Sequence, residues 1–243
     1  MMDKTCMSLN SIKFALENSA FLGVLVFAGK PETQKKEINI KRYKEMTNER
    51  FSIFPTGWWD EVKQKATPRQ RPQQTQTINW VYDYIKSERA RMATEGFRAM
   101  APNASREEKQ TFKTLNFEYA TFSGIFSYRN ARSLVSRTPF LTIDIDHLNT
   151  EEETKELKRI LVLDQRIETA LCFVSPSGRG IKWIVRLPEW TVGLSFKEQF
   201  ETVRQYVGFN YGIDPDKSGS DVCRACFLPY DSECFMNYKY NTL

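Results

Sequence analysis

The sequence contains one histidine, His147, among its 243 residues. Every mechanism and every metal site that needs two histidines is therefore excluded. A nucleophilic pair of Cys172 with His147 is also disfavoured, because nothing in the sequence brings the imidazole ring to that thiol.

Long apolar runs and export signals are missing as well. The longest run, residues 20–28, has about half of the ~20 residues that a bilayer span needs, and its composition is typical of a buried strand. Residues 1–10 lack the basic-then-apolar order of a signal peptide, and the five cysteines then argue against an extracellular disulfide framework. The sequence predicts a cytoplasmic protein without a membrane partner.

Neither sign of charge dominates. Lysine and arginine total 35 against 30 aspartate and glutamate residues, which gives a net charge of +5. That mild excess suits a polyanionic partner but is common among soluble proteins. With 41% apolar residues, the chain can bury a substantial core in one large domain or two small ones.

Residues 1–97 are expected to form a mixed α/β region. We predict a strand at residues 21–27 and helices around residues 40–47 and 78–92. Residues 64–77 are rich in glutamine, threonine, proline and arginine, which predicts an exposed, mobile loop. Its arginines could contact a phosphate backbone, although a solvated linker is the commoner use of such a segment.

Residues 98–243 alternate between strand and helix patterns. The expected elements are a helix capped by Ser105 and Glu108, a β-prone segment at 119–128, a strand at 140–146, a helix capped by Thr150 and Glu153, strands at 170–174 and 181–187, a helix capped by Ser195 and Glu198, and a last strand within 223–228. From residue 140 the order is β-α-β-β-α-β, the split arrangement of ferredoxin-like and RNA-recognition-motif folds. We therefore predict an α+β protein with this module at 98–243. Because that scaffold serves many functions, the site residues must decide among them.

Two aspartates end the strand at residues 140–146. Asp144 and Asp146 are two positions apart, so they share one face at roughly 6.6 Å spacing. The alternating apolar residues Leu141, Ile143 and Ile145 face the core. Two such carboxylates repel each other, and a bound divalent cation relieves the repulsion. A strand end that runs into solvent is the alternative.

A turn with two glycines at residues 175–180 precedes a strand with outward cations. Gly178 and Gly180 allow backbone N–H groups to approach an anion, and Arg179, Lys182 and Arg186 supply charge for a triphosphate. A simple hairpin would use glycines but would not need the cations. The predicted nucleotide-binding residues are Ser177, Gly178, Arg179, Gly180, Lys182 and Arg224.

Further carboxylates lie at residues 214–224, before the last expected strand. A ferredoxin-like sheet would bring Asp216 and Arg224 near the strand of Asp144. We predict Asp216 as the third metal ligand, with Asp221 as its substitute. A surface loop rich in aspartate, serine and glycine is the alternative.

These three elements together resemble the motifs of the archaeo-eukaryotic primase superfamily. The motifs are a strand that ends in Asp-x-Asp, a Ser-x-Gly-x-Gly-like turn with a basic residue after it, and a later aspartate with an arginine downstream. The wording of residues 173–183, with residues 121–126 upstream and 231–237 downstream, is similar to the BT4734-like, or virulence-associated E N-terminal, domain of Bacteroides and their mobile elements. The resemblance spans residues 98–237 and implies a primase-like domain that is commonly fused to a helicase.

One position departs from the resemblance. Many relatives in the superfamily place a histidine in the second motif, where this chain has Lys182. Lysine still binds phosphate as a point charge, so nucleotide binding tolerates the change better than catalytic rate does.

The leading hypothesis is a metal-dependent nucleotidyltransferase of primase-polymerase type. Asp144, Asp146 and Asp216 would be the catalytic metal ligands for Mg²⁺ or Mn²⁺. The expected partners are nucleoside triphosphates, a single-stranded or primed DNA template and a separate helicase, in replication of a mobile element or phage. A non-catalytic nucleotide- or nucleic-acid-binding replication protein is the alternative. A rolling-circle nickase is excluded because its metal needs a histidine pair.

Two further patterns leave alternatives open. Cys223 and Cys226 have half of a zinc-site spacing, with Cys234 further along, but no fourth ligand is evident and buried thiols are favoured. Trp58 and Trp59 could stack on single-stranded bases, although packing in a core or interface is the commoner use of such aromatics.

Overall fold

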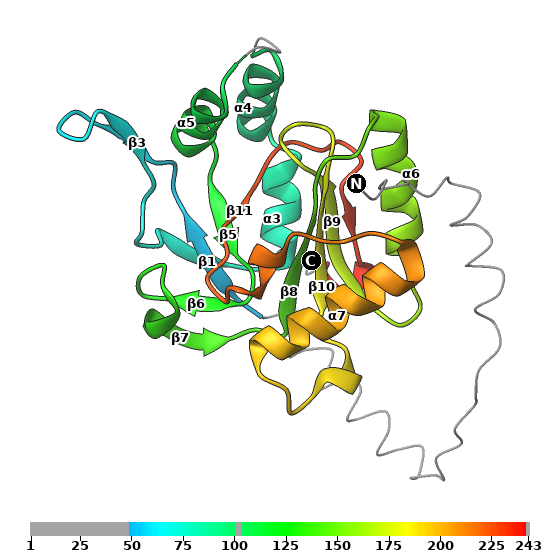
Figure 1. The fold of residues 1–243 in the computed structure, drawn as a ribbon. Helices are drawn as coiled ribbons and strands as arrows, with labels where there is room; N and C mark the ends of the chain where they lie inside the picture. The colour runs from blue at the N-terminus through cyan, green and yellow to red at the C-terminus, as the bar shows by residue number, and fades with distance from the viewer. Residues whose placement is uncertain (1–48, 101–103, 242–243) are drawn as a thin grey trace, which may run out of the picture.

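The computed structural model describes residues 49–100 and 104–241, and it shows the α+β architecture that the sequence predicts. The strand expected at 21–27 and the helix expected at 40–47 lie outside these residues. Two four-stranded antiparallel sheets form the body (Figure 1). Within the described ranges, no helix has the length and apolar character needed to cross a membrane.

The first sheet has the order β11-β5-β1-β4. Its strands are β1 (Phe51–Phe54), β4 (Gln74–Gln76), β5 (Tyr119–Thr121) and β11 (Cys226–Phe227). All four residues of β1 are buried, because β1 lies between two other strands and is covered by the core. The sheet therefore joins strands from the predicted N-terminal region to strands from the predicted module.

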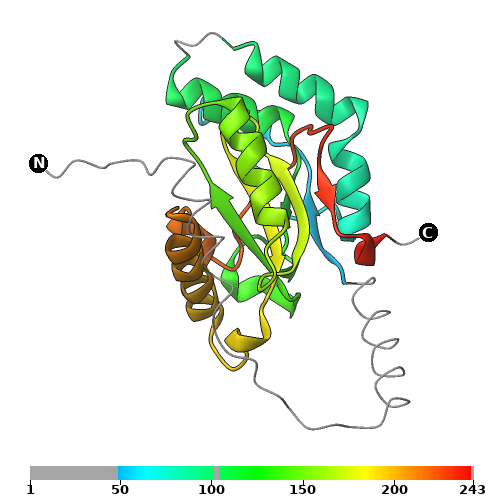
Figure 2. The ribbon, with the colours of Figure 1, turned by 90° about the vertical axis from the view of Figure 1, so that its right-hand side faces the viewer.

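The second sheet has the order β12-β9-β10-β8. Its strands are β8 (Phe140–Ile145), β9 (Thr169–Val174), β10 (Ile181–Arg186) and β12 (Phe235–Met236). Helices α6 (Glu151–Val162) and α7 (Phe196–Tyr211) cover one face (Figure 2). The other face shares a core with β1 and with helix α3 (Ile78–Ile85), so the sheet is buried on both sides.

The order β8-α6-β9-β10-α7 follows the pattern predicted from residue 140, with β10 between β8 and β9. The last strand differs from the expectation. It shortens to β11 and pairs with β5 of the first sheet instead of lying beside β8. The β-prone composition of residues 223–228 suits either edge, so the sequence pattern alone does not choose the partner.

A short 3₁₀ helix, η3 (Lys217–Ser220), lies along the free edge of β8. The backbone N–H of Asp216 donates to the carbonyl of Asp144 at 2.9 Å. Gly219 also packs closely here, since a Cβ on it would lie 3.0 Å from the carbonyl of Thr142. The chain thus passes along this edge without forming a strand, and it brings Asp216 beside Asp144.

The remaining elements surround these sheets. They are helices α4 (Glu88–Arg98) and α5 (Arg106–Asn116), the hairpin β2 (Trp58–Asp60) and β3 (Lys65–Thr67), the hairpin β6 (Gly124–Phe126) and β7 (Leu134–Arg137), and the 3₁₀ helices η1 (Ala131–Ser133), η2 (Glu189–Thr191) and η4 (Tyr238–Tyr240). The capping boxes predicted at Ser105 and Ser195 are confirmed. The helical stretch predicted around 78–92 divides at Ser87, which caps α4. The segment 64–77, predicted as an exposed, mobile loop, instead contains the short strands β3 and β4, because pairing with β2 and β1 supplies the backbone hydrogen bonds that its composition does not reveal.

Candidate metal and nucleotide site

Strand β8 carries its two faces as the alternation predicts. Leu141, Ile143 and Ile145 lie in the core under α6 and α7. Asp144 points to the opposite face, where the first sheet and α5 lie, and its side chain is only 7% exposed. The polar face of β8 is therefore the wall of a cleft between the two halves of the protein.

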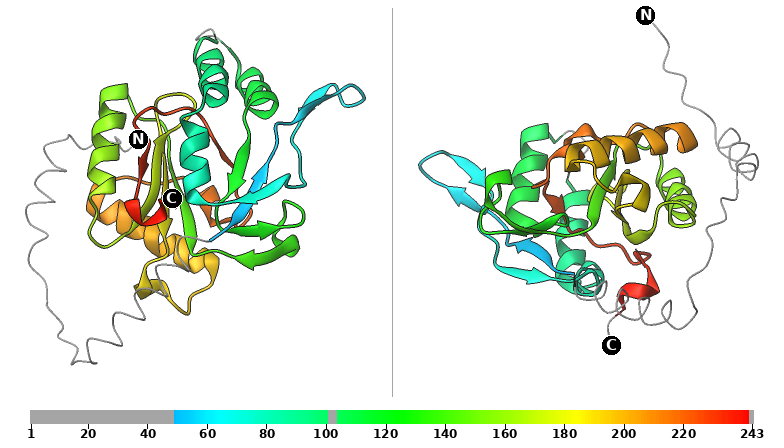
Figure 3. Two further views of the ribbon diagram at one scale, coloured as in Figure 1. Left: turned by 180° about the vertical axis from the view of Figure 1, so that it is seen from behind. Right: turned by 90° about the horizontal axis from the view of Figure 1, so that it is seen from below.

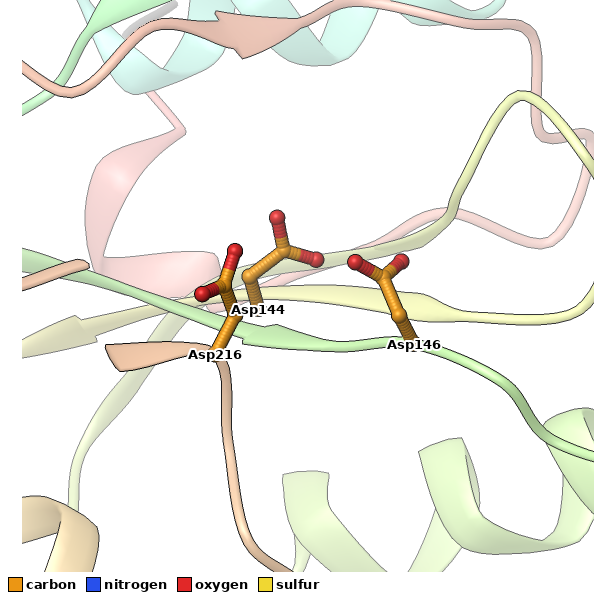
Figure 4. A group of neighbouring side chains, drawn as sticks. All are labelled: Asp144, Asp146 and Asp216. Carbon is orange, nitrogen blue, oxygen red and sulfur yellow. The ribbon is translucent and has the colours of Figure 1, made fainter. Parts of the chain in front are cut away.

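Three carboxylates meet at this wall (Figure 4). One oxygen from each of Asp144, Asp146 and Asp216 lies within 4.8 Å of the others. Asp216 is held in place by the backbone N–H of Ser218 at 3.0 Å and by its hydroxyl at 2.6 Å. Partial burial opposes ionisation, but these hydrogen bonds and the charge of Arg224 lower the pKa of Asp216 below its ordinary value.

Two cations lie among these carboxylates. Lys182 is the cross-strand partner of Asp144 in the β8–β10 ladder, and its ammonium donates to the Asp144 carboxylate and lies 3.7 Å from that of Asp146. Arg224 lies 3.0 Å from Asp216 and 3.7 Å from Asp144. Burial alone would lower the pKa of Lys182, but Asp144 and Asp146 outweigh it and raise that pKa. Lys182 is therefore a charged, buried partner of Asp144.

Lys182 and Arg186 are not the outward cations that the strand pattern predicts. The Lys182 side chain is 11% exposed and turns to the aspartates. Arg186 forms an ion pair with Glu49 at 3.0 Å. The alternation gives the face correctly, but it does not reveal that another layer of the protein covers that face.

The glycine turn contributes in part. Ser175 and Ser177 line the cleft, whereas Arg179 is exposed and does not. Gly178 adopts φ +79°, which disfavours a side chain. A Cβ on Gly180 would lie 2.7 Å from the carbonyl of Ile145 and 3.0 Å from a carboxylate oxygen of Asp146. Glycine at 180 therefore lets the turn pass directly beside Asp146.

The cleft has a volume of about 310 Å³. Its lining residues are Pro68, Gln110, Lys113, Thr114, Tyr119, Arg129, Asp144, Asp146, Ser175, Pro176, Ser177, Lys182, Arg224, Ala225 and Phe227. The sequence reading missed Lys113 of α5, Tyr119 of β5 and Arg129. None of the three belongs to a recognisable motif in the sequence. They reach the aspartates only through the tertiary fold.

The two arginines of the cleft, Arg129 and Arg224, each have a hydrogen-bond donor without a partner. Nε of Arg129 and Nε of Arg224 are buried without a hydrogen-bond partner in the structure. The third such side-chain atom in the described ranges is Oγ1 of Thr67, next to Pro68. Buried donors without partners are costly, and an anionic ligand in the cleft would supply acceptors.

The three aspartates fit a hard divalent cation. Carboxylate oxygens are the ligands that Mg²⁺ and Mn²⁺ prefer. Opposite ligands of octahedral Mg²⁺ lie about 4.2 Å apart, twice the metal–oxygen distance. The 4.8 Å spread of the three oxygens thus needs only small side-chain movements. Asp221 bonds to the backbone and thiol of Cys223 instead, and it is not part of the cluster.

The cysteines considered for zinc lie in separate places. Cys226 and Cys234 belong to the core between the sheets, and Cys223 lies in a smaller cluster with Phe54 and Tyr119. Burial raises the pKa of Cys226 to about 12 and that of Cys223 to about 11. Cys223 and Cys226 are therefore protonated, packed thiols at neutral pH.

A family model identifies the chain. The BT4734-like, N-terminal domain model matches residues 112–236, slightly more than half of the sequence. The protein therefore belongs to the BT4734-like N-terminal domain family. No curated protein and no solved structure matches the chain. The matched region contains all three clustered aspartates, Lys182 and Arg224.

Proposed function

We propose that this protein is a metal-dependent nucleotidyltransferase of primase-polymerase type that adds nucleotides to a nucleic-acid 3′-hydroxyl. The observation that carries the proposal is the cluster of Asp144, Asp146 and Asp216 in a cleft with basic residues on its other walls. Three carboxylates favour divalent cations, and surrounding cations favour a polyphosphate. A triphosphate with its metal satisfies both halves of the site.

The remaining parts of the proposal follow from the motif resemblance. We propose that residues 98–243 form a primase-polymerase module in which β8-α6-β9-β10-α7 carries the split arrangement without its last strand, with residues 1–97 as an added region, and that the chain is a member of the archaeo-eukaryotic primase superfamily. The metal would be Mg²⁺ or Mn²⁺. The substrates would be nucleoside triphosphates and a single-stranded or primed DNA template. A separate helicase would unwind the duplex. The protein would act in the cytoplasm.

The cleft residues have distinct tasks in this proposal. Divalent cations held by Asp144, Asp146 and Asp216 would activate the attacking 3′-hydroxyl and neutralise the leaving pyrophosphate. Arg224 and Arg129 would direct their free N–H groups to the phosphates. After the 3′-hydroxyl loses its proton to solvent, the 3′-oxygen would bond to the α-phosphorus, the bond from that phosphorus to the bridging oxygen of the β-phosphate would break, and pyrophosphate would leave.

In this proposal Lys182 has two alternative anionic partners, the Asp144 carboxylate and a phosphate of the nucleotide. Without ligand it neutralises Asp144, and a divalent cation at Asp144 would compete with its ammonium for the same oxygens. A triphosphate offers the displaced ammonium a new anionic partner. We therefore propose that Lys182 exchanges Asp144 for phosphate when metal and nucleotide bind together.

The same contact favours a second candidate, a non-catalytic nucleotide- or nucleic-acid-binding replication protein. If the Lys182 ammonium keeps its place between Asp144 and Asp146, it occupies the position that a metal needs. Primer extension with Mn²⁺ and labelled nucleotides separates the candidates. Extended product supports nucleotidyl transfer, whereas nucleotide binding without product supports the second candidate.

A further inference from the structure

The hairpin β2–β3 projects from the body of the protein and is not absorbed by the site described above. Figures 1 and 3 show it as a narrow arm beyond α5. Trp58 and Trp59 lie on this arm with exposed fractions of 38% and 42%. Among the described residues, both indoles therefore keep much of their surface open to solvent instead of lying in a core.

The arm has a fixed base. The backbone N–H of Gly57 donates to the carbonyl of Thr114 in α5 at 2.7 Å. A Cβ on Gly57 would lie 2.4 Å from the carbonyl of Thr67 and 2.7 Å from Cγ2 of Thr114, so only glycine allows this packing. The hairpin is therefore held against α5 at a set position, and α5 itself lines the cleft.

The base of the arm continues into the cleft. Pro68 directly follows β3 and is one of the cleft residues. The hydroxyl of Tyr119, another cleft residue, donates to the carbonyl of Arg69. The backbone N–H of Arg129 donates to the carbonyl of Gln70 at 2.8 Å. The aspartate site and the arm thus share one wall.

Cations accompany the aromatic rings along this wall. The guanidinium of Arg69 lies 4.5 Å from the ring centroid of Trp58. Arg129, with its unpartnered Nε, lies where the arm meets the cleft. Exposed aromatic rings beside arginines are the chemistry that binds single-stranded nucleic acid, because bases stack on the rings and phosphates pair with the cations.

We propose that the β2–β3 hairpin is a docking arm for single-stranded nucleic acid. Bases stack on Trp58 and Trp59, which as neighbours in β2 present their rings on opposite faces of the arm, and Arg69, beside Trp58, and Arg129 contact the backbone as the strand crosses the arm toward the aspartate cleft. This inference rests on the proposed function for its direction toward the cleft. It names the surface that takes the template.

Anisotropy titration of a labelled single-stranded oligodeoxythymidylate with the full chain tests the arm. The titration is done without metal or nucleotide, so it does not depend on catalysis. The double variant Trp58→Ala/Trp59→Ala should raise Kd at least tenfold, and Trp58→Phe/Trp59→Phe should stay within about threefold, because phenylalanine still stacks. Trp190→Ala is the matched control, since Trp190 is 47% exposed but packs beside Tyr206 on another part of the surface, and its Kd should not change.

Each outcome separates the arm from the catalytic proposal. Equal Kd for the wild type and the alanine pair, or no binding by the wild type, overturns the docking arm even if primer extension succeeds. Binding that depends on the tryptophans supports the arm even if primer extension fails. Equal loss in the phenylalanine pair, with an unchanged circular dichroism spectrum, also overturns it, because stacking would then not be the cause.

Discussion

Lys182 lies directly opposite Asp144 in the β8–β10 ladder and donates a hydrogen bond to its carboxylate. Both side chains are almost fully buried, so each charge depends on the other for neutralisation. The pair gives the site two possible states: lysine on the aspartate, or metal on the aspartate with lysine on phosphate.

Lys182→Ala should lower the melting temperature without metal, because the Asp144 carboxylate then stays buried with only the more distant Arg224 nearby. It should also increase the stabilisation that Mn²⁺ provides, because the competing ammonium is gone. Thermal unfolding with and without Mn²⁺ measures both effects. Equal metal-induced shifts in variant and wild type would show that Lys182 and metal do not compete.

Loss of the Lys182 ammonium should strengthen metal binding but weaken nucleotide binding. Lys182→Ala is expected to weaken nucleoside triphosphate binding by about 1 to 3 kcal/mol, the scale of a lost charge-assisted contact. Lys182→His should retain more affinity, since a protonated imidazole still donates to phosphate. Calorimetric titration of nucleotide with Mn²⁺ present compares the three proteins. Unchanged affinity in the alanine variant would place the phosphate away from Lys182.

Gly180→Ala should destabilise the protein by about 1 to 3 kcal/mol, because the added methyl group meets the fixed carbonyl of Ile145 and the carboxylate of Asp146. Gly208→Ala is the matched control. Its nearest neighbour is 3.5 Å away and it lies within α7, so alanine there should stabilise by about 1 kcal/mol. Urea unfolding of both variants checks the opposite signs, and a neutral effect at 180 would contradict the close packing.

The decrease in the free energy of unfolding at low pH should depend on Asp216. Its pKa is lowered in the folded protein, so its contribution is present above the ordinary value of 3.8 and is lost as the pH falls through the lower folded value. The difference in unfolding free energy between wild type and Asp216→Asn should therefore be constant near neutral pH and shrink as the pH falls below the ordinary value of 3.8. A difference that grows on acidification would reverse the assigned shift.

Local patterns in the sequence predict much of this arrangement. The face of Asp144, the capping boxes at Ser105 and Ser195, and the family all follow from residues close in sequence. The partner of β11 and the cleft positions of Lys113 and Arg129 do not, because they depend on how two sheets pack. The ion pair of Lys182 is intermediate, since the predicted split arrangement places its strand beside that of Asp144 but does not predict the burial that turns the ammonium inward.

Primer extension by Asp144→Asn/Asp146→Asn tests the central claim most directly. Asparagine keeps the size and an oxygen acceptor for Lys182, but the buried ammonium loses its counter-charge, so the double variant should lose about 3 to 5 kcal/mol of stability, and circular dichroism checks that it remains folded. Asp221→Asn, which changes an aspartate outside the cluster, is the control. With Mn²⁺, a primed template and labelled nucleotides, the account predicts product from the wild type and from Asp221→Asn and none from the double variant. Undiminished incorporation by the double variant would contradict it.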